Sequence, residues 1–149
     1  MGRHKNALRE HYIAPFVDRE TLPEEADYMY LAKYISDITD ATDEETDDTG
    51  FYDGDGTVET TVTGVSIGYT FSGFFDPTDP AQAFIAAMRR LTGSGRRVWH
   101  KIISSDGSTI WEGWATVTDI TAGAGAATDD EEFECTITFN QIPTETVAI

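Results

Sequence analysis

The chain has 149 residues, and 27 acidic against 10 basic side chains give it a formal net charge of −17. This charge excludes electrostatic attraction to nucleic acid, although a surface that is merely solubilising would also account for its sign. With Cys135 as the single cysteine, a disulfide scaffold and a thiolate zinc site within one chain are also excluded.

The N-terminal segment, residues 1–26, is predicted to be a flexible arm, because it is polar, lacks hydrophobic periodicity and contains Pro15 and Pro23. Residues 28–38 are rich in aromatic and β-branched side chains and predict the first strand. Residues 39–56 combine many acids with few apolar side chains, so a long surface loop is expected there. Loops of this length in a compact domain are usually functional or disordered.

The next segment, residues 57–72, predicts a half-buried strand with a bend at Gly64, because apolar and small polar residues alternate along it. One face of this strand carries Val65, Ile67, Tyr69 and Phe71. We expect that face to pack in the core, and the opposite face to contact water or a partner.

One amphipathic helix is predicted over residues 80–91. Asp79 is a suitable N-cap, Pro80 fits the first helical position, and Gln82 is placed to complete a capping box. A glycine that favours a left-handed stop follows at Gly93. The apolar stripe of the helix consists of Phe84, Ile85, Met88 and Leu91. This stripe predicts a helix that lies against a sheet.

Two more strands are predicted after the helix, at residues 97–103 and 110–120. They flank Asp106 and Gly107, a dipeptide that strongly favours a tight hairpin. A loop of small residues and acids follows at residues 121–132. These segments therefore predict an antiparallel pair.

The most regular alternation lies in residues 133–140, which predict the last strand, and residues 141–149 are expected to form a flexible tail. The apolar face of this strand carries Phe133, Cys135, Ile137 and Phe139. Cys135 is thus expected to be a small core residue. The predicted fold class is mainly β: a single domain, residues 1–149, with its body at 28–140. About five or six antiparallel strands would form a β-sandwich or partial barrel with one flanking helix.

Two patterns that could indicate chemistry are better explained as structure. Residues 64–68 match the G-x-S-x-G nucleophile elbow, but the predicted strand continues past the serine, and His100 is the only later histidine. The sequence DGDG at 53–56 lacks the spacing of an EF-hand loop, so a solvated turn is favoured over a looser calcium site. We therefore expect no catalytic residue, no metal and no cofactor. No segment is long and apolar enough to predict a membrane anchor or a signal peptide, so cytoplasmic synthesis is expected.

Three tryptophans on neighbouring predicted strands allow a different kind of function. Trp99, Trp111 and Trp114 could form a platform for a sugar ring, although aromatic clusters on paired strands are more often core or interface. A carbohydrate-binding β-sandwich is thus an open alternative. It predicts that these tryptophans are exposed.

The order and spacing of several segments resemble the major tail tube proteins of long-tailed bacteriophages, of the siphovirus type. The resemblance extends over about residues 28–144. Its most specific parts are GFFDPTDPAQAF, the DG hairpin followed by EGWATVTDI, and the acidic ending DDEEFECTITFNQIP.

This resemblance implies two packed antiparallel sheets with one flanking helix, six copies closed into a ring, and rings stacked into a hollow tube. The tube would conduct the viral genome during ejection, so the protein would be structural and not an enzyme. It would be assembled in the host cytoplasm and reside in the virion tail. The implied partners are further copies of the chain and the tape-measure, tail-terminator and distal tail proteins, while double-stranded DNA passes without specific binding. An inner-tube subunit of a contractile tail, a tailocin or a type VI secretion-like apparatus is an alternative.

Negative charge would suit such a channel, because carboxylates on its wall repel the phosphates of DNA. The residues predicted to face the lumen are Glu59, Thr61, Thr63, Glu134, Thr136 and Thr138. The acidic loop is predicted to bridge neighbouring subunits or rings. Its acids are Asp43, Glu44, Glu45, Asp47, Asp48, Asp53 and Asp55.

Overall fold

The computed structural model describes residue 5 and residues 8–50, 52 and 56–147. The fold is mainly β. Its strands are β1 (Glu10–Pro15), β2 (Met29–Tyr30), β3 (Ile35–Asp40), β4 (Asp43–Gly50), β5 (Val58–Ser66), β6 (Gly68–Phe74), β7 (Arg97–Ile103), β8 (Thr109–Ala122), β9 (Glu132–Phe139) and β10 (Thr144–Val147). One α-helix, α1 (Pro80–Ala87), continues directly into a 3₁₀ turn, Met88–Arg90.

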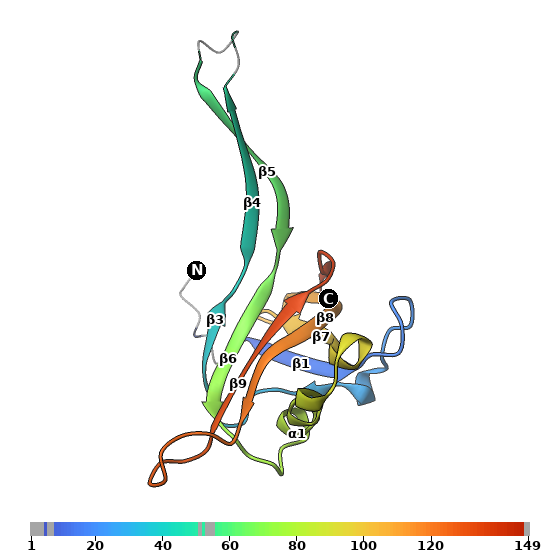
Figure 1. Ribbon diagram of the computed structural model, residues 1–149. Coiled ribbons are helices and arrows are strands. Elements are labelled where there is room, and N and C mark those ends of the chain that lie inside the picture. The colour runs from blue at the N-terminus through green and yellow to red at the C-terminus, as the bar shows by residue number, and fades with distance from the viewer. Residues whose placement is uncertain (1–4, 6–7, 51, 53–55, 148–149) are drawn as a thin grey trace.

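Eight strands form one antiparallel sheet in the order β2-β1-β7-β8-β9-β6-β3, with β10 paired to β8. The sheet curves into a half-barrel, and α1 flanks the body (Figure 1). The predicted mainly antiparallel β class with one flanking helix is confirmed. The described residues contain more strands than the five or six predicted, because short pairings at both ends of the chain carry weak sequence signals.

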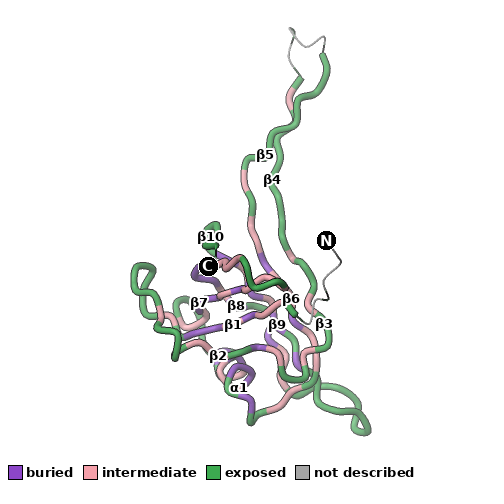
Figure 2. Tube along the Cα trace, turned by 180° about the vertical axis from the view of Figure 1, so that it is seen from behind, coloured by how far each residue is buried: buried purple, intermediate pink, exposed green. Residues whose placement is uncertain are grey.

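Contrary to the predicted loop over residues 39–56, most of residues 39–50 lie in strands; residues 51 and 53–55 lie outside the described residues. β4 pairs with β5 over its whole length, from Asp43 opposite Ser66 to Gly50 opposite Val58. β3 and β6 continue the two arms of this hairpin into the main sheet. The hairpin therefore projects far beyond the body (Figure 1), and it is exposed along most of its length (Figure 2). β5 lies within the strand predicted at residues 57–72, whereas β4 was missed because this strand has no apolar side chain to bury.

The predicted terminal arm and tail also contribute strands. β1 lies inside the sheet between β2 and β7, with Ile13 and Ala14 fully buried. Residues 28–38 form two strands rather than one, because Tyr34 adopts a left-handed backbone with φ of 60° between β2 and β3. β10 lies within the predicted tail. Short polar segments such as these gain their structure from pairing with a neighbouring strand, which local periodicity does not reveal.

The main core lies on one face of the sheet. The predicted apolar face of the last strand is confirmed, since Phe133, Cys135, Ile137 and Phe139 are buried. Burial raises the pKa of the Cys135 thiol to about 12. This cysteine is therefore an inert core residue, because only a thiolate reacts readily. Core packing also includes Ile13, Leu31, Phe71, Ile85, Val98, Ile102 and Val117.

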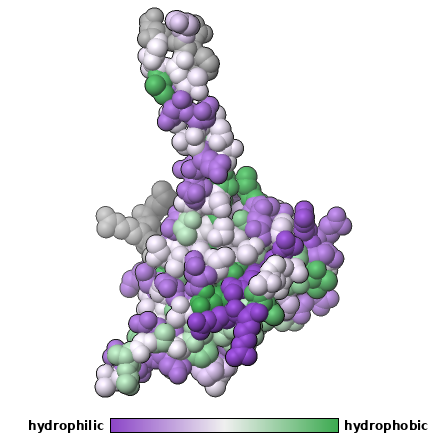
Figure 3. Space-filling model, viewed as in Figure 1, coloured by the Kyte–Doolittle hydropathy of each residue, from purple (hydrophilic) through white to green (hydrophobic). Residues whose placement is uncertain are grey.

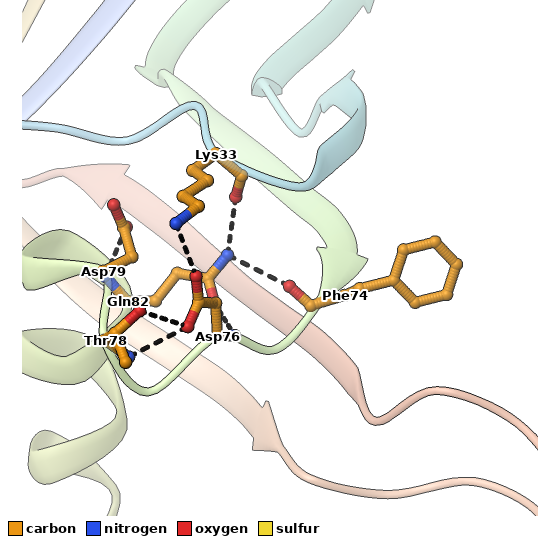
Figure 4. A network of polar contacts seen from close by, with 6 residues as sticks. All are labelled: Lys33, Phe74, Asp76, Thr78, Asp79 and Gln82. Carbon is orange, nitrogen blue, oxygen red and sulfur yellow. Dashed lines mark hydrogen bonds and ion pairs between the residues drawn. The ribbon is translucent and has the colours of Figure 1, made fainter.

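The helix begins as predicted, with one difference at Gln82. Asp79 caps the helix by accepting a bond from the Gln82 backbone N–H at 3.2 Å, and Pro80 occupies the first turn. The Gln82 side chain is fully buried, but it does not complete a capping box. It accepts from the Asp76 N–H at 2.6 Å and donates to the carbonyls of Lys33 and Phe74 at 2.8 and 3.1 Å (Figure 4). This amide thus joins the helix to the ends of β6 and the β2–β3 connection.

The apolar stripe of the helix is confirmed in part. Ile85 and Met88 are buried and Phe84 is half-buried, but Leu91 is exposed beyond the end of the 3₁₀ turn. Gly93 has a φ of 57°, in the left-handed region that favours glycine. The hairpin at Asp106 and Gly107 joins β7 to β8 as predicted.

Candidate functional site

The first candidate surface is the projecting hairpin, whose two faces differ in chemistry. Directly opposed residues of an antiparallel pair lie on the same face. We call one side the valine face: it carries Val58, Thr60 and Val62 on β5 opposite Gly50, Asp48 and Thr46 on β4. We call the other side the acidic face: it carries Glu59 and Thr61 opposite Thr49 and Asp47. Val58 and Val62 are 58% and 54% exposed, so the valine face presents apolar surface to solvent.

The acids predicted to bridge subunits lie mostly on this hairpin. Asp43, Glu44, Glu45, Asp47 and Asp48 are exposed residues of β4, while Asp53 and Asp55 lie outside the described residues. None of the five β4 acids forms an ion pair within the described part of the chain. Figure 3 shows hydrophilic surface along most of the hairpin, interrupted by a hydrophobic residue. The sequence identified these acids, but it did not reveal that alternate residues face opposite sides of a two-stranded ribbon.

The second candidate surface is the sheet face that points away from the main core. Four threonines lie side by side across four strands: Thr39, Thr70, Thr136 and Thr118. The hydroxyl oxygens of Thr70 and Thr136 are 3.1 Å apart, within hydrogen-bond distance. The result is a row of hydroxyl groups, and the next row on this face carries the acids Asp37 and Glu134 on either side of Ser72.

The six residues predicted to face a lumen are split between these two surfaces. Glu134, Thr136 and Thr138 alternate with the buried residues of β9 and thus lie on the outer sheet face. Glu59 and Thr61 lie on the acidic face of the hairpin, and Thr63 follows on the same strand next to a register shift. The structure does not bring the two groups together.

The three tryptophans do not form an exposed platform. Trp99 and Trp114 are 3% and 8% exposed and pack with Ala14 and Phe16 in a small second cluster. Trp111 packs against the main core, on the opposite side of the sheet. This arrangement contradicts the sugar-binding alternative, because a platform needs accessible rings on one face.

Most cationic side chains of the described residues already have partners. Lys33 and Asp76 form the one ion pair found there, at 2.9 Å, and Arg96 donates to the carbonyls of Leu91 and Arg89. The cations that lie over aromatic rings are Arg9 on Trp111, Arg19 and Arg97 on Trp114, and Lys101 on Tyr12 and Tyr28. Within the same residues, Arg89 and Arg90 are exposed guanidinium groups with neither an ion pair nor a ring contact.

A buried histidine pair joins β1 to β7. His11 Nδ1 and His100 Nε2 are 3.2 Å apart, and both side chains are almost inaccessible. The rings of Tyr69, Phe71 and Phe139 surround them. Desolvation lowers the pKa of His11 to about 4, with a further contribution from the Arg9 charge. Burial, followed by the nearby His11, lowers the pKa of His100 well below its usual value.

The residues that the structure describes include no candidate metal site. Within them, no group of three or more His, Cys, Asp and Glu side chains is placed to hold a metal ion. The serine of the G-x-S-x-G pattern, Ser66, ends β5 and pairs with Asp43. None of the helices in the described ranges is long and apolar enough to cross a bilayer.

The sequence matches no family model, and no curated protein is significantly similar to it. Solved structures do match. A chain from the tail of an empty gene transfer agent particle with C6 symmetry has a TM-score of 0.60 and 18% identity, covering 91% of this chain and 94% of that chain. A chain from the virion of the native gene transfer agent particle has a TM-score of 0.61 and 17% identity, covering 93% and 95%.

A third match is a chain from the cap that terminates the tube of the anti-feeding prophage, with a TM-score of 0.57 and 14% identity, covering 99% and 93%. The three matches extend over nearly the whole of both chains. This protein therefore has the tail tube fold found in phage-like particles. The structures do not single out the siphovirus group that the sequence resembles.

Proposed function

We propose that this protein is a tail tube subunit of a phage-like particle, in which six copies close into a ring and the rings stack into a tube. The observation that carries this proposal is the fold shared with a chain from a C6-symmetric tail, over 91% of this chain and 94% of that one.

The isolated subunit also has features that suit assembly. A two-stranded hairpin that is solvated on both faces is at best marginally stable in water, so β4 and β5 need a neighbour. β3 lies at one edge of the main sheet, where its unpaired backbone groups are free to pair with another copy. Closing the sheet across subunits would remove that edge.

Such a tube would serve as a passive conduit for a genome. Six chains of net charge −17 give one ring a net charge of 6 × −17 = −102, which opposes electrostatic binding of DNA by the assembled tube. We assign the outer sheet face of β9, with Glu134, Thr136 and Thr138, to the lumen. We assign Glu59, Thr61 and Thr63 to an extension of the same wall along the hairpin. Tape-measure, terminator and distal tail proteins would bind at the ends and inside the tube.

The proposal predicts assembly of the purified protein. Concentrated protein should form six-fold rings or tubes in negative-stain electron micrographs, because the hairpin and the open sheet edge become buried only between copies. Analytical ultracentrifugation of the same samples gives the mass of the smallest assembled species. A protein that stays monomeric over roughly a hundredfold range of concentration would contradict the tube function.

The lumen assignment predicts a salt-dependent change in DNA passage. In particles assembled from Glu134→Lys subunits, ejection of DNA should slow at low salt, because six lysines per ring then attract the phosphates. Salt should diminish the difference, because charges are screened beyond roughly 8 to 10 Å at physiological ionic strength. Time courses of DNA release test this, with Glu20→Lys as an equal charge change outside the assigned face. Equal rates for Glu134→Lys and the control at low salt would disprove the assignment.

An inner tube of a contractile injection apparatus is the second candidate. The match to the tube cap of the anti-feeding prophage is the observation that favours this candidate. A contractile tail surrounds its tube with a sheath, so assembled tubes would sediment together with a sheath protein encoded nearby. A flexible tail would have no such partner.

A further inference from the structure

We propose that the valine face of the β4–β5 hairpin seats in a groove beside α1 on the next copy in the stack, with Asp48 placed against Arg89 and Arg90. The inference rests on the tube proposed above and adds the receiving surface, which the sequence did not predict. It joins the one hairpin face that presents apolar side chains to the one pair of arginines in the described residues that has no partner.

The groove lies between the end of the helix and the ends of β6 and β8. It is lined by Phe75, Ala86, Ala87, Arg89, Arg90 and Ala122. Small and aromatic apolar side chains thus form most of its surface, and two exposed guanidinium groups border it. A segment that fits must combine apolar side chains with negative charge.

The charge of the groove is not neutralised within its own chain. An acidic loop, residues 123–131, begins directly after Ala122, and the Glu131 carbonyl accepts a bond from the Phe75 N–H. Even so, none of the described carboxylates lies within 4.0 Å of either guanidinium group. Arg89 and Arg90 are therefore available to an anionic partner.

The valine face has the complementary chemistry. Val58 and Val62 flank Thr60, and Asp48 lies directly opposite Thr60, so one acid lies between two exposed apolar side chains. The hairpin has no cation of its own, because the chain contains no Lys or Arg between Lys33 and Arg89. No cation on the hairpin therefore repels the arginines of a second copy, and Asp48 is free to attract them.

The positions of the valine face and the groove favour a stack of copies over a closed dimer. In Figure 1 the hairpin projects from one end of the body, while α1 lies toward the other end. Two different surfaces at opposite ends make a head-to-tail contact, and such contacts propagate into filaments. The same hairpin then has its acidic face free for the lumen.

A charge-reversal series tests the contact. Asp48→Lys should reduce the fraction of protein in stacked tubes at least tenfold and leave rings, because the lysine faces Arg89 and Arg90. Arg89→Glu and Arg90→Glu, made separately, should have the same effect, and pairing Asp48→Lys with one of them should restore tubes. Asp47→Lys is the matched control, since it changes the neighbouring residue on the opposite face of the strand. Negative-stain micrographs and sedimentation give the fractions of tubes and rings.

Each result separates the contact from the tube function. Wild-type protein that forms no rings contradicts the tube itself. Wild-type tubes together with normal stacking of Asp48→Lys overturn the contact and leave the tube function standing. Rescue of Asp47→Lys instead of Asp48→Lys by the arginine reversals would also overturn it, because the acidic face would then be the one in the groove. Circular dichroism of each variant excludes misfolding as the cause of a lost assembly.

Discussion

The Gly73→Ala variant should be less stable than the wild type by about 3 kcal/mol, which lies at the upper end of the cost of overpacking. Gly73 on β6 pairs with Ile35 at the start of β3. A methyl group at Gly73 would overlap the carbonyl oxygen of Tyr34 and lie 2.8 Å from the Ile35 Cα. Both are backbone atoms, so rotation of a side chain does not relieve the clash. The loss should appear in urea unfolding as a lower midpoint with a similar slope.

The matched control is Gly64→Ala, on the projecting hairpin. A methyl group there meets only the Glu45 side chain, at 3.7 Å or more, which is an ordinary contact. Its free energy of unfolding should differ from that of the wild type by less than about 0.5 kcal/mol. Equal stability of Gly73→Ala and this control would contradict the close approach of the β3 backbone to Gly73 on β6. This approach matters for assembly, because β3 and β6 form the base from which the hairpin projects.

Acid should destabilise the fold through the buried histidine pair. Above the pKa of a free histidine, about 6.5, both imidazoles are neutral in the folded and unfolded chains and contribute no pH dependence. Below it, the unfolded chain takes up protons that the folded chain excludes. The loss is about 1.4 kcal/mol per pH unit for each histidine. Because the folded pKa of His11 is about 4, this residue alone removes about 3 kcal/mol between pH 6.5 and 4, and His100 adds to it.

Several other groups lie near this pair and must be considered. Arg9 and Tyr69 border His11, and Asp37 and Asp40 line the same surface pocket. Both aspartates are exposed, and hydrogen bonds from the Thr42 side chain and backbone N–H lower the pKa of Asp40.

A double substitution isolates the contribution of the histidines. In His11→Phe/His100→Leu, the free energy of unfolding should change little between pH 6.5 and 5, whereas the wild type loses at least about 2 kcal/mol over this range. Urea unfolding at a series of pH values measures both slopes. Equal slopes for the two proteins would contradict the prediction. Release of β1 is the expected structural result of acid, since the rings of His11 on β1 and His100 on β7 contact each other diagonally across the two strands.

The strongest local signals in the sequence were also the most accurate. Asp79 and Pro80 predicted the start of the helix, and the regular alternation of β9 predicted its buried face. These signals succeed because a cap depends on adjacent residues and a half-buried strand has a period of two. The tight turn predicted at Asp106 and Gly107 was equally accurate, since Gly107 has a positive φ of 76°.

The signals failed where a segment gains its structure from a distant strand. β1 contains Pro15 and polar flanks, yet its central residues are buried between two other strands. Gln82 was expected to cap its own helix, but its side chain instead bonds to backbone groups that lie outside it. A sequence window contains no information about such partners, because they are brought close only by the complete fold.

By itself the sequence determined the mainly β class, the single helix, the position of the core cysteine and the acidic character of the hairpin residues. Each of these follows from composition or from short-range periodicity. Only the tertiary structure decided that residues 43–50 form one strand of a projecting hairpin and that Asp47 and Asp48 lie on opposite faces of it. It also decided that Arg89 and Arg90 border an apolar groove. The physical reason is that strand register fixes the direction of every side chain, and register depends on pairing between distant segments.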